Sequence, residues 1–194
     1  MEKIYLASAS SRRQQLLQQL GIDFDVVVPE VCERQAASES PADYVRRIAS
    51  EKARQVSGVV ARRRLPQRPV LGADTCIIVD DRILGKPRDR DDGETMLRRL
   101  SGREHSVLTA VTVLSAGAEY TALSTSRVDF RAITDREIAQ YWETGEPTDK
   151  AGAYALQGRA AAFVAKIDGS YSGIVGLPLY EVAQLLKKIG IDLL

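Results

Sequence analysis

Apolar and polar positions follow two different periods along this chain, and Gly or Pro residues separate many of the segments. Short apolar or alternating runs predict strands, and apolar residues spaced by three or four positions predict helices. The strands expected on this basis span residues 4–6, 24–28, 70–73, 76–79, 82–84, 105–114, 119–132 and 160–167. Helices are expected over residues 14–20, 91–100 and 178–189, and two more begin at Ser40 and Thr134.

Two pairs of these strands are expected to form hairpins. Asp80-Asp81 predicts a tight turn before residues 82–84, and residues 115–118 separate two long apolar segments. Gly85-Lys86-Pro87 closes the first hairpin. It is not a P-loop, because no Gly lies five residues before Gly85 and Pro follows the lysine.

The first predicted helix carries its charges at the wrong end. Ser10 is the expected N-cap, which places Arg12 and Arg13 in the first turn, where the helix dipole disfavours cations. An anion bound by the arginines, the hydroxyls and the free N–H groups relieves this conflict. The alternative is two solvated arginines on an exposed helix. We favour a phosphate site because the hydroxyls and the misplaced charges coincide.

Three other charged residues each admit two interpretations. Asp74 interrupts an apolar strand segment, so it is either a turn residue or a carboxylate paired with a cation. Lys52 borders the apolar face of the helix that starts at Ser40, where it either snorkels to solvent or reaches into a cleft. Glu33 follows a strand in a loop and is either solvated or part of a site.

Two stretches rich in small residues follow in the second half of the chain. Residues 149–158 combine small side chains with isolated polar groups, and Gly there permits close backbone approach to a ligand. Residues 170–176 form a second loop of glycines and hydroxyls before a helix, which makes a second anion site conceivable.

Composition excludes several classes of protein. The chain has 194 residues, enough for one domain or two small lobes, and its net charge of +1 gives no general attraction to nucleic acid. Two cysteines and one histidine provide neither a disulfide framework nor a two-histidine metal site. No apolar run has transmembrane length, so we expect a cytoplasmic protein that binds neither membrane nor nucleic acid.

Nine sequence blocks, taken together, resemble the Maf family of nucleoside triphosphate pyrophosphatases. They occur in family order and cover nearly the whole chain. The blocks are LASASSRR at 6–13, residues 29–33, ASEKA at 49–53, GADT at 72–75, LGKP at 84–87, LSG at 100–102 with His105, DKAGAY at 149–154, LQG at 156–158, and GSY at 169–171 through GLPL at 176–179.

The resemblance implies a fold and a reaction. The fold is a two-lobed α/β structure with a mixed sheet, similar to inosine triphosphate pyrophosphatases, with the active-site cleft between the lobes. Residues 1–194 then form a single domain, which in this family often assembles as a homodimer. The implied reaction cleaves a nucleoside triphosphate between the α- and β-phosphates, giving the monophosphate and pyrophosphate, and needs Mg²⁺ or Mn²⁺.

Each candidate site residue can be given a role in this implied reaction. Ser8, Arg12, Arg13 and Lys86 are expected to bind the substrate phosphates, and Lys52, which supplies further positive charge, is expected to be catalytic together with Asp74 and Glu33. Glu33 and Asp74 supply oxygen ligands for a metal ion, and either could orient the attacking water. We prefer Asp74 as the general base, because its apolar neighbours are expected to raise its pKa.

Base preference is expected to depend on three of these positions. Gln157, Thr75 and Arg13 resemble the subgroup that acts on dTTP and UTP, and the Gln157 amide suits a pyrimidine edge. The alternatives are the same chemistry on modified or purine nucleotides, and a non-catalytic regulator of cell division that binds nucleotides or nucleic acid.

The chain departs from the family pattern at three positions. Ser11 stands where Pro is usual, Cys32 where an acid is common, and Ala110 where Gly is frequent. Cys32 in place of an acid changes how many carboxylates are expected to coordinate a metal ion.

Overall fold

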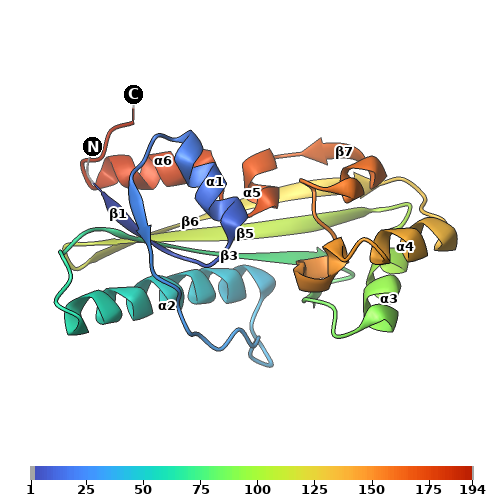
Figure 1. Ribbon diagram of the computed structural model, residues 1–194, viewed down its shortest axis with the longest axis horizontal. Coiled ribbons are helices and arrows are strands. Elements are labelled where there is room, and N and C mark those ends of the chain that lie inside the picture. The colour runs from blue at the N-terminus through green and yellow to red at the C-terminus, as the bar shows by residue number, and fades with distance from the viewer. Residues whose placement is uncertain (1–2, 194) are drawn as a thin grey trace. The chain divides into compact units, whose positions relative to one another are not determined.

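The computed structural model describes residues 3–193, which form helices and a mixed sheet (Figure 1). The strands are β1 (Ile4–Ala7), β2 (Phe24–Val26), β3 (Val70–Val79), β4 (Arg82–Leu84), β5 (Glu104–Ser115), β6 (Ala118–Phe130) and β7 (Val164–Asp168). The α-helices are α1 (Ser11–Gln19), α2 (Pro41–Arg62), α3 (Arg90–Leu100), α4 (Asp135–Trp142), α5 (Tyr171–Val175) and α6 (Leu179–Lys188). Short 3₁₀ turns span Glu146–Asp149, Ala151–Ala153 and Arg159–Phe163.

The strands follow the order β2-β1-β3-β5-β6-β7, and β4 pairs with the end of β3. β1 is parallel to both β2 and β3, whereas β4 and β7 are antiparallel to their neighbours. The chain divides into two compact units, the first of residues 1–74, 109–124 and 176–194, and the second of residues 75–108 and 125–175. The two-lobed mixed α/β fold expected from the sequence is confirmed.

The first unit is layered. Figure 1 shows α2 on one side of its strands and α1 with α6 on the other. Apolar side chains of β1, α2 and β3, including Tyr5, Val56 and Val70, form the core between α2 and the strands. This arrangement explains the apolar stripe along α2, because that face of the helix is covered by the sheet.

The second unit has its own core. Side chains from α3, α4, the end of β3, the start of β5 and the 3₁₀ turn Arg159–Phe163 meet there, among them Leu97, Ile138 and Phe163. Gly93 permits the close approach of α3 to α4, because a Cβ at this position would come within 2.2 Å of the Trp142 ring.

Both predicted hairpins are confirmed. Asp80 and Asp81 have φ of 51° and 57°, and Ala116 and Gly117 have φ of 47° and 81°. Positive φ at both central residues is the geometry of a type I′ turn, whose twist matches that of paired strands.

Several predicted segments differ in the structure. The strands expected at 70–73 and 76–79 form one strand, β3, and the strand expected at 119–132 ends at Phe130. The second strand ends at Val26 instead of residue 28. The strand expected from residue 160 begins only at Val164, because Arg159–Phe163 lacks β-branched residues and folds as a 3₁₀ turn after Gly158. The loop at 170–176 contains the short helix α5, whose first turn is capped by the Ser170 hydroxyl, which accepts a hydrogen bond from Gly173 N at 3.0 Å.

Candidate active site

The parallel strands β1, β2 and β3 bring Ser8, Glu33 and Asp74 to the same end of the sheet, at the carboxyl end of β1. Ala7, the last residue of β1, pairs with Gly72 of β3, so Asp74 lies two residues beyond the end of β1. The loop with Ser8 leaves β1 at this end, and the segment leading to Glu33 leaves β2 there. Ligands of open α/β sheets bind outside the carboxyl ends of parallel strands, where these residues lie.

The loop between β1 and α1 is built around two serine hydroxyls. Ser10 is the N-cap of α1 and accepts a hydrogen bond from Arg13 N at 3.4 Å. The buried Ser8 hydroxyl accepts hydrogen bonds from Ser10 N at 3.2 Å and from Arg13 Nη1 at 3.3 Å. Arg13 also donates from Nε to the Gly176 carbonyl at 2.8 Å. The prediction of a capped helix start is confirmed, and Arg13 is not a freely solvated side chain.

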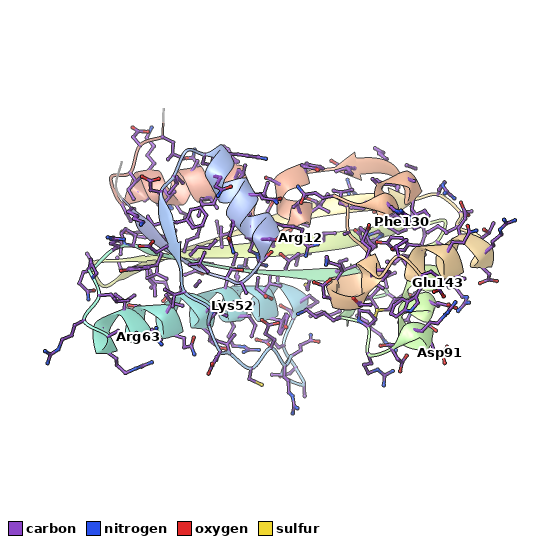
Figure 2. The ribbon with its side chains drawn as sticks, in the orientation of Figure 1. Arg12, Lys52, Arg63, Asp91, Phe130 and Glu143 are labelled. Carbon is purple, nitrogen blue, oxygen red and sulfur yellow. The ribbon has the colours of Figure 1, made fainter. Side chains whose placement is uncertain are left out.

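Lys52 joins two carboxylates. Its Nζ lies 2.7 Å from Asp74 Oδ1 and 2.6 Å from Glu33 Oε1. Lys52 and Asp74 are only 6% and 5% exposed, whereas the Glu33 side chain is 45% exposed. Figure 2 labels Lys52 on α2 and Arg12 on α1. Lys52 therefore does not snorkel to solvent, and Asp74 is a buried strand residue instead of a turn residue.

Small residues allow the helix to approach the strand this closely. A Cβ on Gly72 would lie 2.3 Å from the carbonyl oxygen of Ala49 and 3.0 Å from Cβ of Ala53. Real side chains do not tolerate such contacts, so only Gly fits at this position. The GADT and ASEKA blocks pack against each other here, and this packing sets the separation of Lys52 from Asp74.

The charges of this cluster act on one another. Burial raises the pKa of Asp74, although the nearby charges of Lys52 and Arg13 oppose the rise. Burial lowers the pKa of the Arg13 guanidinium, and the charges of Asp74 and Glu33 oppose this change. Arg13, Lys52, Glu33 and Asp74 thus form one electrostatic group, which we call the carboxylate–cation cluster.

Three supporting residues escaped the sequence analysis. Tyr44 Oη donates to the Glu33 carbonyl at 3.4 Å, and the Gln55 side chain contacts both N and O of Glu30 at 2.8 and 3.0 Å. These contacts fix the loop that carries Glu33. The spacing of Tyr44, Lys52 and Gln55 on one helix face could have indicated their common direction. The role of the Gly176 carbonyl, which orients Arg13 from 163 positions away, had no local signal.

The second unit contains the other three candidates. Thr75 follows Asp74 in β3, and Lys86 and Gln157 lie on exposed loops. Gly152 N donates to the Gly85 carbonyl at 2.9 Å, which joins the loop of Lys86 to the stretch rich in small residues. Gly152 has φ of 65°, and a Cβ there would lie 2.8 Å from Ile77. In the structure, Gly152 therefore serves close packing within the protein, and the expected approach of this stretch to a ligand stays a prediction.

The cluster can bind an anion and a hard cation. Guanidinium groups and the N-terminal N–H groups of α1 suit phosphate oxygens, and two carboxylates suit Mg²⁺ or Mn²⁺. Within residues 3–193, no group of three or more His, Cys, Asp or Glu side chains could hold a metal ion. A metal bound at Glu33 and Asp74 thus needs further ligands besides these two carboxylates. None of the helices over this range is long and apolar enough to cross a bilayer.

Comparisons with known proteins agree over almost the whole chain. Residues 3–189 match the Maf family, described as "Maf-like protein". Proteins named dTTP/UTP pyrophosphatase are similar to this chain. That of Ralstonia nicotianae is 51% identical over 98% of this chain and 95% of its own length. That of Symbiobacterium thermophilum is 50% identical over 98% and 95%.

A solved structure, that of the Staphylococcus aureus Ham1 protein, also matches. It is 15% identical, with a TM-score of 0.42 over 69% of this chain and 73% of that one. A likeness at this level adds nothing to the match with the family.

Proposed function

This chain belongs to the Maf family, and we propose on that premise that it hydrolyses nucleoside triphosphates, preferably dTTP and UTP, to the monophosphate and pyrophosphate. The names of its relatives support this substrate class. The observation that carries the proposal is the carboxylate–cation cluster, in which Lys52 contacts Asp74 and Glu33 at 2.7 and 2.6 Å. A site that only bound phosphate would gain nothing from two carboxylates, because they repel the ligand.

In this proposal, the loop between β1 and α1 binds the phosphates. Arg13 is held by Ser8 and Gly176, so its guanidinium is already oriented before substrate binds. Pre-oriented donors cost little reorganisation when charge develops on the phosphates. Arg12 beside it and Lys86 of the second unit are proposed as further phosphate-binding cations, since a triphosphate carries about four negative charges.

Asp74 is proposed as the general base. Its raised pKa makes it a better proton acceptor than an ordinary carboxylate. Water attacks the α-phosphorus and gives its proton to Asp74. A new P–O bond forms, the bond from the α-phosphorus to the bridging oxygen breaks, and pyrophosphate leaves. Lys52 holds the Asp74 carboxylate in place and offsets its charge, and Glu33 is the alternative base.

The donor set fits a magnesium or manganese ion. Mg²⁺ is commonly bound by one or two carboxylates together with substrate phosphates and water, and Glu33 and Asp74 match this description. We propose that these two residues hold the ion together with the triphosphate. When bound, the ion neutralises phosphate charge and polarises the P–O bonds.

Base recognition is proposed for Gln157 and Thr75. The Gln157 amide offers both donors and an acceptor, as a pyrimidine edge requires. We further propose that residues 1–194 act as one domain, that the protein is a cytoplasmic homodimer, and that it acts without nucleic acid or membrane.

A panel of nucleotides tests the proposal. The purified protein with Mg²⁺ or Mn²⁺ is expected to release pyrophosphate from dTTP and UTP faster than from ATP, GTP or modified nucleotides, and EDTA is expected to abolish the release. Preference for a purine or modified nucleotide would show that the proposed substrate is wrong, but the proposed reaction would stand. Release of inorganic phosphate, or nucleotide binding without turnover, would contradict the proposed reaction.

A further inference from the structure

The loop that carries Gln157 is held from inside the second unit by side chains to which the reaction assigns no role. Gln157 itself is exposed, but residues on both sides of it contact Tyr141 or Glu146. Tyr141 is 3% exposed and lies on α4, and Glu146 begins the 3₁₀ turn that follows this helix.

Glu146 accepts every hydrogen bond that it makes to this loop. Its Oε2 accepts from Arg159 N at 3.0 Å, and its Oε1 accepts from Ala160 N at 3.5 Å. Oε1 also accepts from Tyr141 Oη at 2.6 Å. The carboxylate fills the space beneath Gly158, where a Cβ would lie 2.2 Å from Oε1. The residue directly after Gln157 therefore rests on this carboxylate.

Tyr141 extends the contact to the other side of Gln157. Its hydroxyl oxygen accepts a hydrogen bond from Ala155 N at 3.2 Å while donating to Glu146. Burial and the contact with Glu146 raise the pKa of Tyr141, so the phenol keeps its proton for this bond. Together, Tyr141 and Glu146 fix the backbone at Ala155 and at Arg159, two residues before and two residues after Gln157.

We propose that Glu146 is a positioning residue for base recognition, and that it acts by holding the loop on which the Gln157 amide is presented. This inference rests on the proposed function, in which Gln157 reads the base. An amide distinguishes pyrimidine from purine only when its oxygen and nitrogen are held at defined positions, so a loosened loop loses selectivity before it loses catalysis.

The variant Glu146→Gln tests this directly. Gln has the same shape, but its amino group cannot accept a hydrogen bond, so at least one donor among Tyr141 Oη, Arg159 N and Ala160 N loses its acceptor. The ratio of kcat/KM for dTTP to that for ATP is expected to fall about tenfold, as expected for one misplaced hydrogen bond. The lower ratio is expected to come from a rise in KM for dTTP, with kcat nearly unchanged.

Glu143→Gln is the matched control. Glu143, labelled in Figure 2, caps the C-terminal end of α4, has a side chain 67% exposed, and pairs with Arg90. This variant makes the same change in charge three positions earlier in the chain, and its nucleotide ratio is expected to equal that of the wild type.

A merely structural role would leave the ratio unchanged. Fewer folded molecules lower the rates for dTTP and ATP by the same factor, so an unchanged ratio in Glu146→Gln overturns the inference. If this variant does not fold, Tyr141→Phe loses only the hydroxyl and is expected to lower the same ratio.

A double-mutant cycle with Gln157→Ala tests whether Glu146 acts through Gln157. If Glu146 acts through Gln157, adding Glu146→Gln to Gln157→Ala changes the ratio no further. Independent, multiplying effects would overturn the inference. Failure of the wild type to hydrolyse dTTP or UTP would instead refute the proposed function, and is seen before any variant is made.

Discussion

The two units of this protein differ in the burial of charge: among the residues that the structure describes, the buried charged side chains are Lys52 and Asp74, both in the first unit. The charges of Lys52 and Arg13 oppose the rise in the pKa of Asp74, and the charge of Asp74 opposes the fall in the pKa of Arg13. In the second unit, His105 and Tyr154 are uncharged partners, with His105 Nε2 2.8 Å from Tyr154 Oη. Convergent charges suit a reaction on phosphates, whereas fixed neutral groups suit the support of a loop.

Burial favours the neutral form in both units, so it shifts the pKa of an acid and of a base in opposite directions. It raises the pKa of the acid Asp74 and lowers the pKa of the base His105 to about 4. The nearby cations Lys52 and Arg13 oppose the shift at Asp74, whereas Arg103 adds to the shift at His105. The first unit therefore buries an acid together with cations that offset its charge. Such a combination is common at functional sites.

The largest expected effect comes from the charge at Asp74. Asp74→Asn keeps the shape and removes the proton acceptor, so kcat is expected to fall about a thousandfold, as for loss of a general base. Steady-state release of pyrophosphate from dTTP measures it. Asp81→Asn is the control, because Asp81 is an exposed turn residue with φ of 57°, which Asn tolerates. Full activity of Asp74→Asn would show that the reaction does not depend on the buried carboxylate of the first unit.

The next effect concerns the neutral histidine of the second unit. His105 is the only histidine in the sequence. Since its pKa is about 4 in the folded protein and about 6.5 in the unfolded chain, the unfolded chain gains the proton first as the pH falls. The stability that His105 provides is therefore complete above pH 6.5 and is lost toward pH 4, by up to about 3 kcal/mol.

Urea unfolding at several pH values checks this expectation. His105→Gln can still bond to Tyr154 but does not titrate, so its stability is expected to vary less between pH 6.5 and 4.5 than that of the wild type. Lowered carboxylate pKa values, such as those of Glu39 and Glu137 at about 2, reduce stability mainly below about pH 5 and do so equally in both proteins. Equal slopes for the variant and the wild type in this window would contradict the account of His105.

The smallest effect tests the packing beneath the carboxylate–cation cluster. Gly72→Ala forces a Cβ to within 2.3 Å of the Ala49 carbonyl oxygen, and the strain is expected to cost about 1–3 kcal/mol. Gly58→Ala is the matched control on α2. There the nearest atom is the flexible end of Arg62 at 3.3 Å, and Ala is expected to stabilise the helix by about 0.5–1 kcal/mol. Denaturant unfolding of both variants measures the difference, and equal stabilities would show that α2 and β3 do not require this contact.

Local signals in the sequence were sufficient for much of the first unit. Arg12 and Arg13, which follow the N-cap Ser10, violate the helix-dipole preference, and an Asp within an apolar strand is costly, so both positions are conspicuous from the sequence alone. The partners of these groups were not predictable in the same way. Whether Lys52 reaches Asp74 depends on how closely α2 packs on β3, which Gly72 decides from another segment.

The supports of the second unit were harder to predict. Glu146 reads as an ordinary loop acid, and its role depends on Arg159 and Ala160, which are 13 and 14 positions away. The 3₁₀ turn at Arg159–Phe163 has one local signal, the lack of β-branched residues, but its contacts with Glu146 have none. That turn is held by a side chain from another segment, and single-sequence periodicity carries no such information.

Hydrolysis of dTTP in water enriched in ¹⁸O tests the central claim most directly. Attack of water on the α-phosphorus, with Asp74 accepting the proton, places the label in dTMP and leaves pyrophosphate unlabelled. Mass spectrometry or ³¹P NMR of the two products distinguishes these positions. Label in dTMP alone is the predicted result, and label in pyrophosphate or in inorganic phosphate would contradict the account.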